Sequence, residues 1–448
     1  MKRGKKLLFL MGALVLMVGL VFLVISLTPE EEQTQTPDVN ISVFSLDPAK
    51  VTRIKWQYSY EASFSRTENG WVNDADSTFP VNGQVLDKMT QVLQKVEASK
   101  VIAQPAELSE YGLDYPVCSI SITVDGKTHE LAIGNQNAYS GGRYFTNGDG
   151  KVYMVQNDIV NAFAFDAMGA LQMEAIPDMS GVDYLKAEKP EGTFEVFLKK
   201  DSDLAYTSHY KWFMDDKILD TEDVDAIVAK LQALQWRECA THNVTDAQLA
   251  EFKLDNPRVI TVGSGDKSFV LELGKETDKG IYARIAGSKM VYYVGKDISN
   301  AVDNIRYSNL RPDEIIVMEW DKVDSMDIVL ADKTYSLIRE EEADENGCAT
   351  GIYRWMLNGQ KVECAALIEA IGKLETVSRS EEKPAPGAQM IKLVFHRNTT
   401  NFETIELAFY SKDSESCIVT FNGETTVLAK KFYVDKLVTA AQAITEAK

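Results

Sequence analysis

The stretch Tyr111-Gly112-Leu113-Asp114-Tyr115-Pro116 organises this chain, because it recurs 141 residues later as Phe252-Lys253-Leu254-Asp255-Asn256-Pro257. Each copy begins 40 residues after a tryptophan, Trp71 in one case and Trp212 in the other. Each copy is also followed directly by an alternating apolar segment, which is typical of a half-buried β-strand. The sequence therefore predicts a chain built from repeated modules.

The same elements follow one another in the first two modules. Residues 51–73 are predicted to form a strand meander, and residues 82–98 a helix with one apolar face. Residues 193–213 and 221–234 repeat this order, and Asp220 is placed to cap the second helix. Alternating segments then predict further strands in each module. The order favours antiparallel sheets, each with a helix on one face.

A third, shorter copy begins near residue 321 and contains Trp355. Its helix is predicted at residues 362–374. The first two copies span 45 residues from tryptophan to proline, whereas the third spans 31 up to Pro386. A strand and a short helix are therefore expected to be missing. The acidic insert Glu340–Gly347 is predicted to be a solvated hairpin loop.

The N-terminal stretch Leu7–Leu27 contains 21 residues without a charge, and four basic residues precede it. A helix of this length is roughly 31 Å long, which spans the hydrocarbon core of a bilayer. The alternative is a cleaved signal peptide, whose apolar part is about 7 to 15 residues long and ends in a small-x-small site. Residues 24–29 offer no such site. The sequence predicts an uncleaved signal anchor, with the N-terminus in the cytoplasm and the remaining 421 residues outside.

Together these patterns predict an α+β fold: one N-terminal transmembrane helix followed by tandem repeats of antiparallel sheet plus helix. The predicted parts are the basic tip and anchor at 1–27, a polar tether at 28–45, module 1 at 46–166, a linker at 167–181, module 2 at 182–302, a linker at 303–319 and the degenerate module 3 at 320–448.

Charge and cysteine content limit the classes of partner. The part of the chain after Leu27 has 43 basic and 67 acidic residues, a net charge of −24. Nucleic acid and anionic headgroups should repel such a surface. Solubility explains the charge, and a specific cationic partner is the alternative. The cysteines are expected to be small buried residues, since they lie singly along the chain at Cys118, Cys239, Cys348, Cys364 and Cys417.

Residues with chemical potential lack the spacing of a catalytic or metal site. The histidines lie far apart, at His129, His209, His242 and His396, so no zinc site is predicted. Gly263-Ser264-Gly265 is interpreted as a hairpin turn, since it does not have the spacing of a phosphate-binding loop. Asp114 and Asp255 could form a pair of acids, but an Asp before x-Pro also shapes a turn, which is the preferred interpretation. The module tryptophans could bind a glycan or peptide, but core packing is favoured.

The motifs resemble a bacterial family called domain of unknown function 4340, over about Ser45 to Val302. The residues that carry this resemblance form two sets: Gly70-Trp71, Tyr111–Pro116, Leu131–Gly134 and Val152–Val155, then Trp212, Phe252–Pro257, Leu271–Gly274 and Val291–Val294. The resemblance implies a membrane-anchored extracytoplasmic protein, similar to companions of ABC transporters and to gliding-motility auxiliary proteins. It implies no catalytic residues.

We therefore expect a non-catalytic accessory or scaffold protein on the outer face of a cell membrane. Its expected partners are the lipid bilayer, through Leu7–Leu27, and an ABC-type permease or another envelope protein, with no nucleic acid. No cofactor, metal or catalytic residue is predicted. The alternatives are a cell-envelope ligand-binding module and an extracytoplasmic hydrolase whose site is not visible in sequence spacing.

Overall fold

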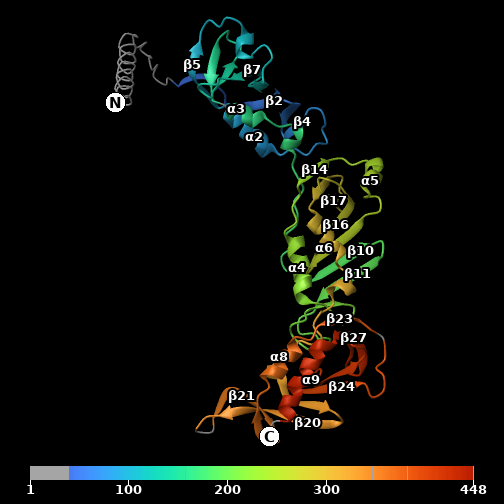
Figure 1. Ribbon diagram of the computed structural model, residues 1–448. Coiled ribbons are helices and arrows are strands. Elements are labelled where there is room, and N and C mark those ends of the chain that lie inside the picture. The colour runs from blue at the N-terminus through green and yellow to red at the C-terminus, as the bar shows by residue number, and fades with distance from the viewer. Residues whose placement is uncertain (1–39, 157, 346–347, 381, 447–448) are drawn as a thin grey trace, which may run out of the picture. The chain divides into compact units, whose positions relative to one another are not determined.

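The computed structural model describes residues 40–156, 158–345, 348–380 and 382–446 (Figure 1). Two compact units divide the chain, Met1–Gln172 and Met173–Lys448. The predicted anchor Leu7–Leu27 lies outside the described residues. Within those residues, no helix combines the length and the apolar character that a membrane crossing requires.

The first unit contains one nine-stranded antiparallel sheet, with the strand order β1-β5-β9-β8-β7-β6-β2-β3-β4. Helices α2 (Gly83–Val92) and α3 (Asp158–Phe163) pack against each other beside it. The strands are β1 (Ile41–Ser45), β2 (Val51–Gln57), β3 (Glu61–Thr67), β4 (Gly70–Asn73), β5 (Lys95–Ile102), β6 (Cys118–Val124), β7 (Lys127–Gln136), β8 (Arg143–Thr146) and β9 (Val152–Val155).

The second unit contains two further nine-stranded antiparallel sheets. In the second sheet the order is β13-β12-β11-β10-β15-β16-β17-β18-β14. Its strands are β10 (Tyr184–Lys189), β11 (Gly192–Leu198), β12 (Trp212–Met214), β13 (Lys217–Ile218), β14 (Glu238–Thr241), β15 (Arg258–Ser264), β16 (Lys267–Glu276), β17 (Ile281–Ile285) and β18 (Val291–Val294). Its helices are α4 (Thr221–Gln232), α5 (Asp246–Phe252) and α6 (Lys296–Asp303).

The third sheet has the order β22-β21-β20-β19-β24-β25-β26-β27-β23. Its strands are β19 (Val323–Leu330), β20 (Lys333–Ala343), β21 (Ala349–Leu357), β22 (Gln360–Val362), β23 (Thr376–Arg379), β24 (Gln389–Arg397), β25 (Thr404–Ser411), β26 (Ser416–Phe421) and β27 (Glu424–Lys430). Its helices are α8 (Ala365–Gly372) and α9 (Lys431–Thr445), and α7 (Tyr307–Leu310) lies between the two sheets in sequence.

Eight strands have the same order in all three sheets. Read from β5, β14 and β23, the sequence of neighbours is the same up to β4, β12 and β21. The sheets differ at their edges, where β1 is added in the first and the short strands β13 and β22 in the others. In each sheet the helix after the meander contacts the helix after the last strand. The antiparallel sheets and the meanders are as predicted.

Each sheet has an apolar face that packs on its helices, because side chains alternate along a strand. In the second sheet, Leu185, Ile260 and Leu271 are fully buried and pack with Val224 and Leu231 of α4. Asp220 caps α4 as predicted, since its side chain accepts a hydrogen bond from the Asp223 N–H at 2.9 Å.

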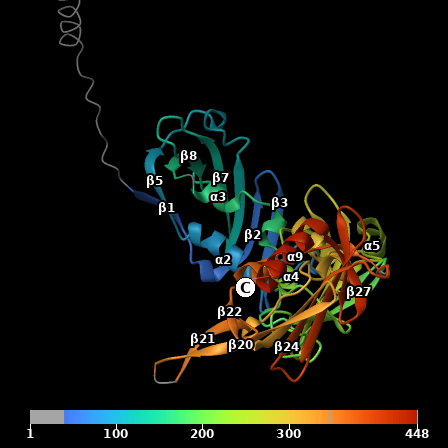
Figure 2. The same cartoon turned by 60° about the horizontal axis from the view of Figure 1, so that its bottom comes forward.

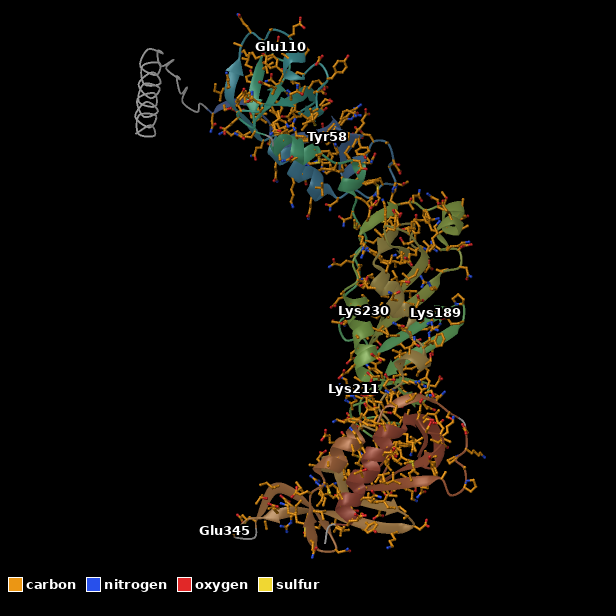
Figure 3. All side chains as sticks on the ribbon, viewed as in Figure 1. Tyr58, Glu110, Lys189, Lys211, Lys230 and Glu345 are labelled. Carbon is orange, nitrogen blue, oxygen red and sulfur yellow. The ribbon has the colours of Figure 1, made fainter. Side chains whose placement is uncertain are left out.

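Lys189 is a buried cation at the end of β10, labelled in Figure 3. Its Nζ donates hydrogen bonds to the carbonyl oxygens of Asp303 and Ile305, each at 3.0 Å. These carbonyls belong to the last turn of α6 and the residues just after it, where a positive charge is favourable. Burial lowers the pKa of Lys189, although Glu191 opposes this effect. Lys189 therefore has a structural role: it caps the C-terminal end of α6.

Two predictions for the first unit were wrong in extent. The predicted tether reaches residue 45, but Ile41–Ser45 forms β1 and pairs with β5. The predicted helix 82–98 ends at Val92, and Lys95–Ile102 is a strand instead. Val96 lies four residues after Val92, which fits a helix, and two before Ala98, which fits a strand. Both Val96 and Ala98 are buried on the sheet.

The third sheet also differs from the prediction. Its expected missing strand is present as β23, which pairs with β27. The short helix has no counterpart between α8 and β24 among the described residues. Glu340–Ala343 belongs to β20 and pairs with β21, so the first half of the acidic insert is strand and not loop. Strand β10, which the prediction for the second module omitted, lies at the centre of the second sheet.

Candidate functional site

The two hexapeptides have one structural role: each closes a short helix with a left-handed residue. Gly112 follows the 3₁₀ turn Leu108–Tyr111 at φ 66°, and Lys253 follows α5 at φ 59°. The next residue donates a hydrogen bond back across the turn, from Leu113 N–H to Leu108 O at 2.9 Å and from Leu254 N–H to Leu249 O at 2.8 Å. This is the Schellman motif of helix ends. Both leucines are buried.

The glycine of the Leu-x-Ile-Gly motif fits against this helix end. A Cβ on Gly134 would lie closer than 3.0 Å to the carbonyl oxygen of Tyr111, and one on Gly274 equally close to that of Phe252. The hexapeptide and the Leu-x-Ile-Gly motif therefore form a single contact, and this contact occurs in both the first and the second sheet. In the third sheet, Tyr410 stands at the position after Leu407-Ala408-Phe409. The described residues between α8 and β24 form no short helix whose end could approach this position, so a side chain is accommodated there.

Asp114 and Asp255 lie exposed on this turn in their respective sheets. The carboxylate of Asp114 accepts a hydrogen bond from the N–H of Tyr115 at 3.0 Å, as expected of a turn former. The two residues belong to separate sheets, so they do not form a pair of acids within either one.

The tryptophans of the first two sheets have matching partners. The indole N–H of Trp71 donates to Asp87 of α2 at 3.0 Å, and that of Trp212 donates to Asp225 of α4 at 2.8 Å. Trp71 and Trp212 are buried, as predicted for core residues. Trp355 is half-buried and packs edge-on against Trp320.

The histidines remain dispersed, and among the described residues no three His, Cys, Asp or Glu side chains gather around a metal-sized space. One group of side chains on the outer face of the third sheet contains the residue types of a catalytic triad. His396 Nε2 lies 3.0 Å from one oxygen of Asp327, and Ser336 donates to the other at 2.6 Å. The carboxylate is the central member, so the imidazole cannot take the serine proton as a nucleophilic triad requires. The group is a cross-strand polar contact.

Four of the five cysteines are buried thiols, as predicted, and Cys348 is exposed. Burial raises the pKa of Cys118 and Cys364 to about 12, and that of Cys239 and Cys417 to about 11. At neutral pH these four thiols are protonated and poor nucleophiles.

A polar site lies in the second unit, where the connection between β11 and β12 reaches the third sheet. We call this connection, residues 199–211, the strap, and Figure 3 labels Lys211 at its end. Tyr206 and Tyr210 of the strap belong to the core of the third sheet. Tyr206 packs on Phe402 and Phe421, and its hydroxyl accepts a hydrogen bond from the N–H of Val317 at 3.1 Å. Burial raises the pKa of both tyrosines.

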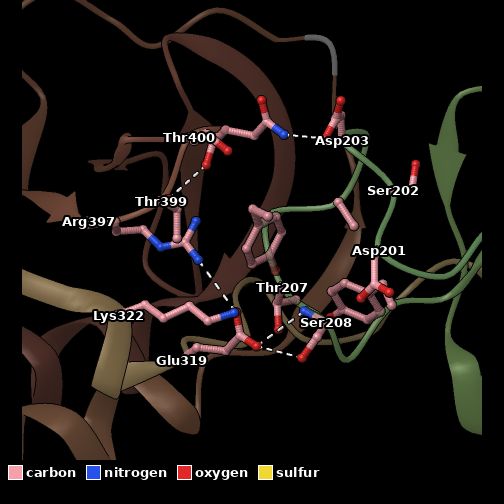
Figure 4. A pocket seen from close by; sticks show the side chains of 14 residues that line it. Asp201, Ser202, Asp203, Thr207, Ser208, Glu319, Lys322, Arg397, Thr399 and Thr400 are labelled. Carbon is pink, nitrogen blue, oxygen red and sulfur yellow. Dashed lines mark hydrogen bonds and ion pairs between the residues drawn. The ribbon is translucent and has the colours of Figure 1, made fainter.

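A cavity of about 240 Å³ opens beside the strap, and Glu319 is its central charge (Figure 4). Glu319 accepts hydrogen bonds from the Ser208 hydroxyl at 2.6 Å and from Lys322 Nζ at 3.1 Å. Arg397 Nη2 approaches the same carboxylate at 3.5 Å. Burial alone would raise the pKa of Glu319, but the hydrogen bonds from Ser208 and Lys322 outweigh it and lower the pKa. Asn401 binds Asp203 at the rim.

Arg397 is 7% exposed, and its Nε has no hydrogen-bond partner among the described residues. Burial lowers the pKa of this guanidinium, while Glu319 acts in the opposite direction. The two cations and Glu319, with hydroxyls of the strap and of Thr399 and Thr400, can bind a polar molecule. The Ser208 hydroxyl contacts the Glu319 carboxylate, but Lys322 and Arg397 also hold this carboxylate and its pKa is lowered, so it is a weak base. A cavity on the opposite side of Tyr206 and Tyr210 is more apolar, with a volume of about 290 Å³.

Sequence reasoning missed this site because the strap lies more than 100 residues before the other residues of the site, Glu319, Lys322 and Arg397. One signal was available: the strand connection has two residues in the first module, Glu68 and Asn69, but thirteen in the second, with two tyrosines. Such an extension in a repeated unit indicates an added contact.

The structure is that of a protein built mostly from antiparallel nine-stranded sheets with few helices, and Tyr206 and Tyr210 of the strap line two of its cavities. A sequence model described as "Domain of unknown function (DUF4340)" matches residues 71–171 and 207–383, more than half of the chain. The chain belongs to this family. No curated protein and no solved structure matches it.

Proposed function

We propose that the protein is a membrane-anchored, extracytoplasmic accessory or scaffold protein of an ABC-type transport system, and that it acts by binding and not by catalysis. The anchor rests on the sequence of Leu7–Leu27, and the transport system on the family resemblance. The observation that carries a binding role is an exposed hairpin of the third sheet.

This hairpin, residues 339–354, extends beyond its neighbours, and we call it the ribbon (Figures 1 and 2). Strand β19 pairs with β20 only as far as Ile338, and β22 pairs with β21 only from Trp355 onward. The ribbon is therefore two-stranded. Figure 3 labels Glu345 near its tip.

Apolar side chains are exposed on the ribbon and at its base. Ile338 is 53%, Ile352 59% and Tyr353 47% exposed. Arg339 stacks on the ring of Tyr353 at 3.7 Å, which holds the ring in one place. Ile352 and Tyr353 are consecutive in β21, so their side chains face opposite sides of the ribbon. Exposed apolar side chains on both sides can contact a protein partner.

The backbone edge of the ribbon is less suited to binding than its side chains. Gly351 has φ 74°, and the register between β20 and β21 shifts between Glu341 and Ala343. A bulge of this kind blunts an edge against pairing with another strand. We therefore assign recognition to the side chains of the ribbon, with its acidic residues facing a basic partner surface.

The same proposal treats the three sheets as tandem copies of one module. The shared order of eight strands and the repeated helix end support it. Superposition of the strand residues of each pair of sheets tests it: a common Cα trace is expected, and unrelated strand paths would contradict it.

The experiment compares full-length chains recovered from membranes of the source cell. The double change Ile338→Ser and Ile352→Ser should reduce the permease subunits that co-purify, while Val377→Ser, which alters a 52% exposed residue on β23, should not. Surface changes of this kind should each alter unfolding by no more than about 0.5 kcal/mol. If the unaltered chain recovers no permease subunit, the transport association is wrong. If it does and the double variant recovers as much, the ribbon is not the contact.

The topology is tested separately with a reporter that is active only outside the membrane, fused after Lys448. Activity of this fusion is expected. A second candidate function, a cell-envelope ligand-binding module, is favoured by the cavities beside the strap.

A further inference from the structure

The more apolar cavity lies behind Tyr206 and Tyr210, within the second unit. Its volume of about 290 Å³ is near the lower end of the roughly 300–1,000 Å³ typical of small-molecule pockets. Aromatic and aliphatic side chains form its walls, among them Phe402, Phe421 and Ile315. A space of this size and lining suits a small molecule with an apolar body, and it is too small for a folded partner.

Three cations border this cavity: Lys217, Arg311 and Arg379. Two acids, Asp216 and Glu314, also line it, so the local charge is positive in a chain whose net charge is −20. Positive charge gathered around an apolar space in an acidic protein favours an anionic ligand by charge complementarity.

Tyr307 positions two of the cations. Lys217 Nζ lies 5.1 Å and the Arg379 guanidinium 4.4 Å from the centre of its ring, and Arg379 also donates to its hydroxyl. Arg311 differs from both. Among the described residues, none forms a side-chain hydrogen bond or ion pair with it. Its fork of N–H donors is free for a ligand, and a guanidinium matches a carboxylate in bidentate geometry.

We propose that this cavity binds a small monoanionic amphiphile, a carboxylate with an aliphatic or aromatic body. The body packs against the wall that Phe402, Phe421 and the strap tyrosines form, and the carboxylate binds Arg311, with Lys217 and Arg379 adding positive charge. A neutral molecule of the same shape keeps the apolar contact but loses the charge-assisted hydrogen bonds. This inference is independent of the ribbon and of the transport association.

The test uses the full chain in lipid nanodiscs, with empty nanodiscs as the blank, and fluorine NMR line broadening. The probes are 4-fluorophenylacetate and its neutral match, 2-(4-fluorophenyl)ethanol. The acid should bind about tenfold more tightly than the alcohol, since a charge-assisted hydrogen bond contributes more than the 1.4 kcal/mol that a factor of ten represents. Added salt should weaken binding of the acid and leave that of the alcohol unchanged.

Arg311→Met should weaken binding of the acid about tenfold, to the level of the alcohol, and Arg311→Lys should give an intermediate affinity because it keeps the charge but not the fork. Arg53→Met, on the first sheet, is the control for general loss of positive charge and should bind as the unaltered chain does. Equal binding of acid and alcohol, or no binding of the acid above the blank, overturns the proposal. This comparison uses the unaltered chain, so it decides the matter even if Arg311→Met fails to fold.

Discussion

Two regions of the sheets differ in how well they recur: the short helix end of the hexapeptide keeps its structure from one sheet to the next, and the hairpin connection does not. The Schellman turn with its closely packed glycine occurs in the same form in the first and second sheets. The connection after β3, β11 and β20 differs each time: a tight turn in the first sheet, the strap in the second and the ribbon in the third. The recurring helix end packs on its own sheet, whereas the strap, one of the variable connections, makes contacts with the next sheet.

The strap and the ribbon are the two extended forms of the hairpin connection. They extend equivalent hairpins of the second and third sheets, and both carry aromatic side chains. Tyr206 and Tyr210 are buried on the sheet that follows in the chain, whereas Tyr353 is exposed. Under the proposed function, the ribbon offers to a partner the kind of contact that the strap makes within the chain.

The largest expected effect distinguishes these two extensions. Tyr210→Ala should destabilise the second unit by about 3–5 kcal/mol, the range for removing a buried aromatic ring, whereas the matched Tyr353→Ala should change stability by no more than about 0.5 kcal/mol. Denaturant titration of residues 40–448 with a probe in the second unit measures both. Similar costs for the two variants would contradict the assignment of the strap to the core and of the ribbon to the surface.

A smaller effect tests the close packing of the repeated helix end. Gly274→Ala should cost about 1–3 kcal/mol or more, because a methyl group must displace the backbone carbonyl of Phe252. Gly372→Ala is the control: it has open space around its Cβ position, and at the end of a helix it should be neutral or stabilising by up to about 1 kcal/mol. The same titration applies. A harmless Gly274→Ala would mean that the helix end and β16 are not held in contact.

The residue with positive φ at the end of each short helix, Gly112 or Lys253, can be changed either to stabilise or to destabilise its unit. Lys253→Gly should stabilise the second unit by about 1 kcal/mol, because glycine adopts a positive φ without the Cβ penalty. Gly112→Ala should destabilise the first unit by at least about 1–2 kcal/mol, since its Cβ would also meet Asn135. Thermal unfolding of each unit measures the two shifts. Shifts of the same sign would show that the two turns are not equivalent.

Local patterns predicted the elements that depend on nearby residues. The Asp220 cap, the meanders and the burial of Trp71 and Trp212 were predicted, and the structure contains them, whereas Trp355 is only half-buried. The boundary between α2 and β5 was missed because Val92 and Val96 satisfy the helix spacing, while the pairing of β5 with β1 and β9 depends on distant strands. Strand β23 was missed for the same reason: it is short, and only β27 stabilises it.

The cavities could not be predicted, because the residues that line them are far apart in the sequence. Glu319 contacts Ser208 because the strap crosses to the third sheet, and it contacts Arg397 because β24 pairs with β19 within that sheet. The cations Lys217, Arg311 and Arg379 meet through three separate elements. The acidic composition of the chain gave no sign of these cations either, because the net charge of a chain does not show whether the charge at one site is positive or negative.

The smallest expected effect decides whether the repeated hexapeptide is purely structural. Asp114→Asn and Asp255→Asn should each change the free energy of unfolding by no more than about 0.5 kcal/mol, because the amide oxygen can accept the same turn hydrogen bond and asparagine is common in turns. Both side chains are exposed, so a docking role would affect partner recovery and leave stability unchanged. Denaturation and recovery of membrane partners should therefore be measured on the same variants. If Asp114→Asn unfolds normally and loses a partner that the unaltered chain recovers, the hexapeptide is a binding surface, and recurrence within this chain no longer identifies its structural parts.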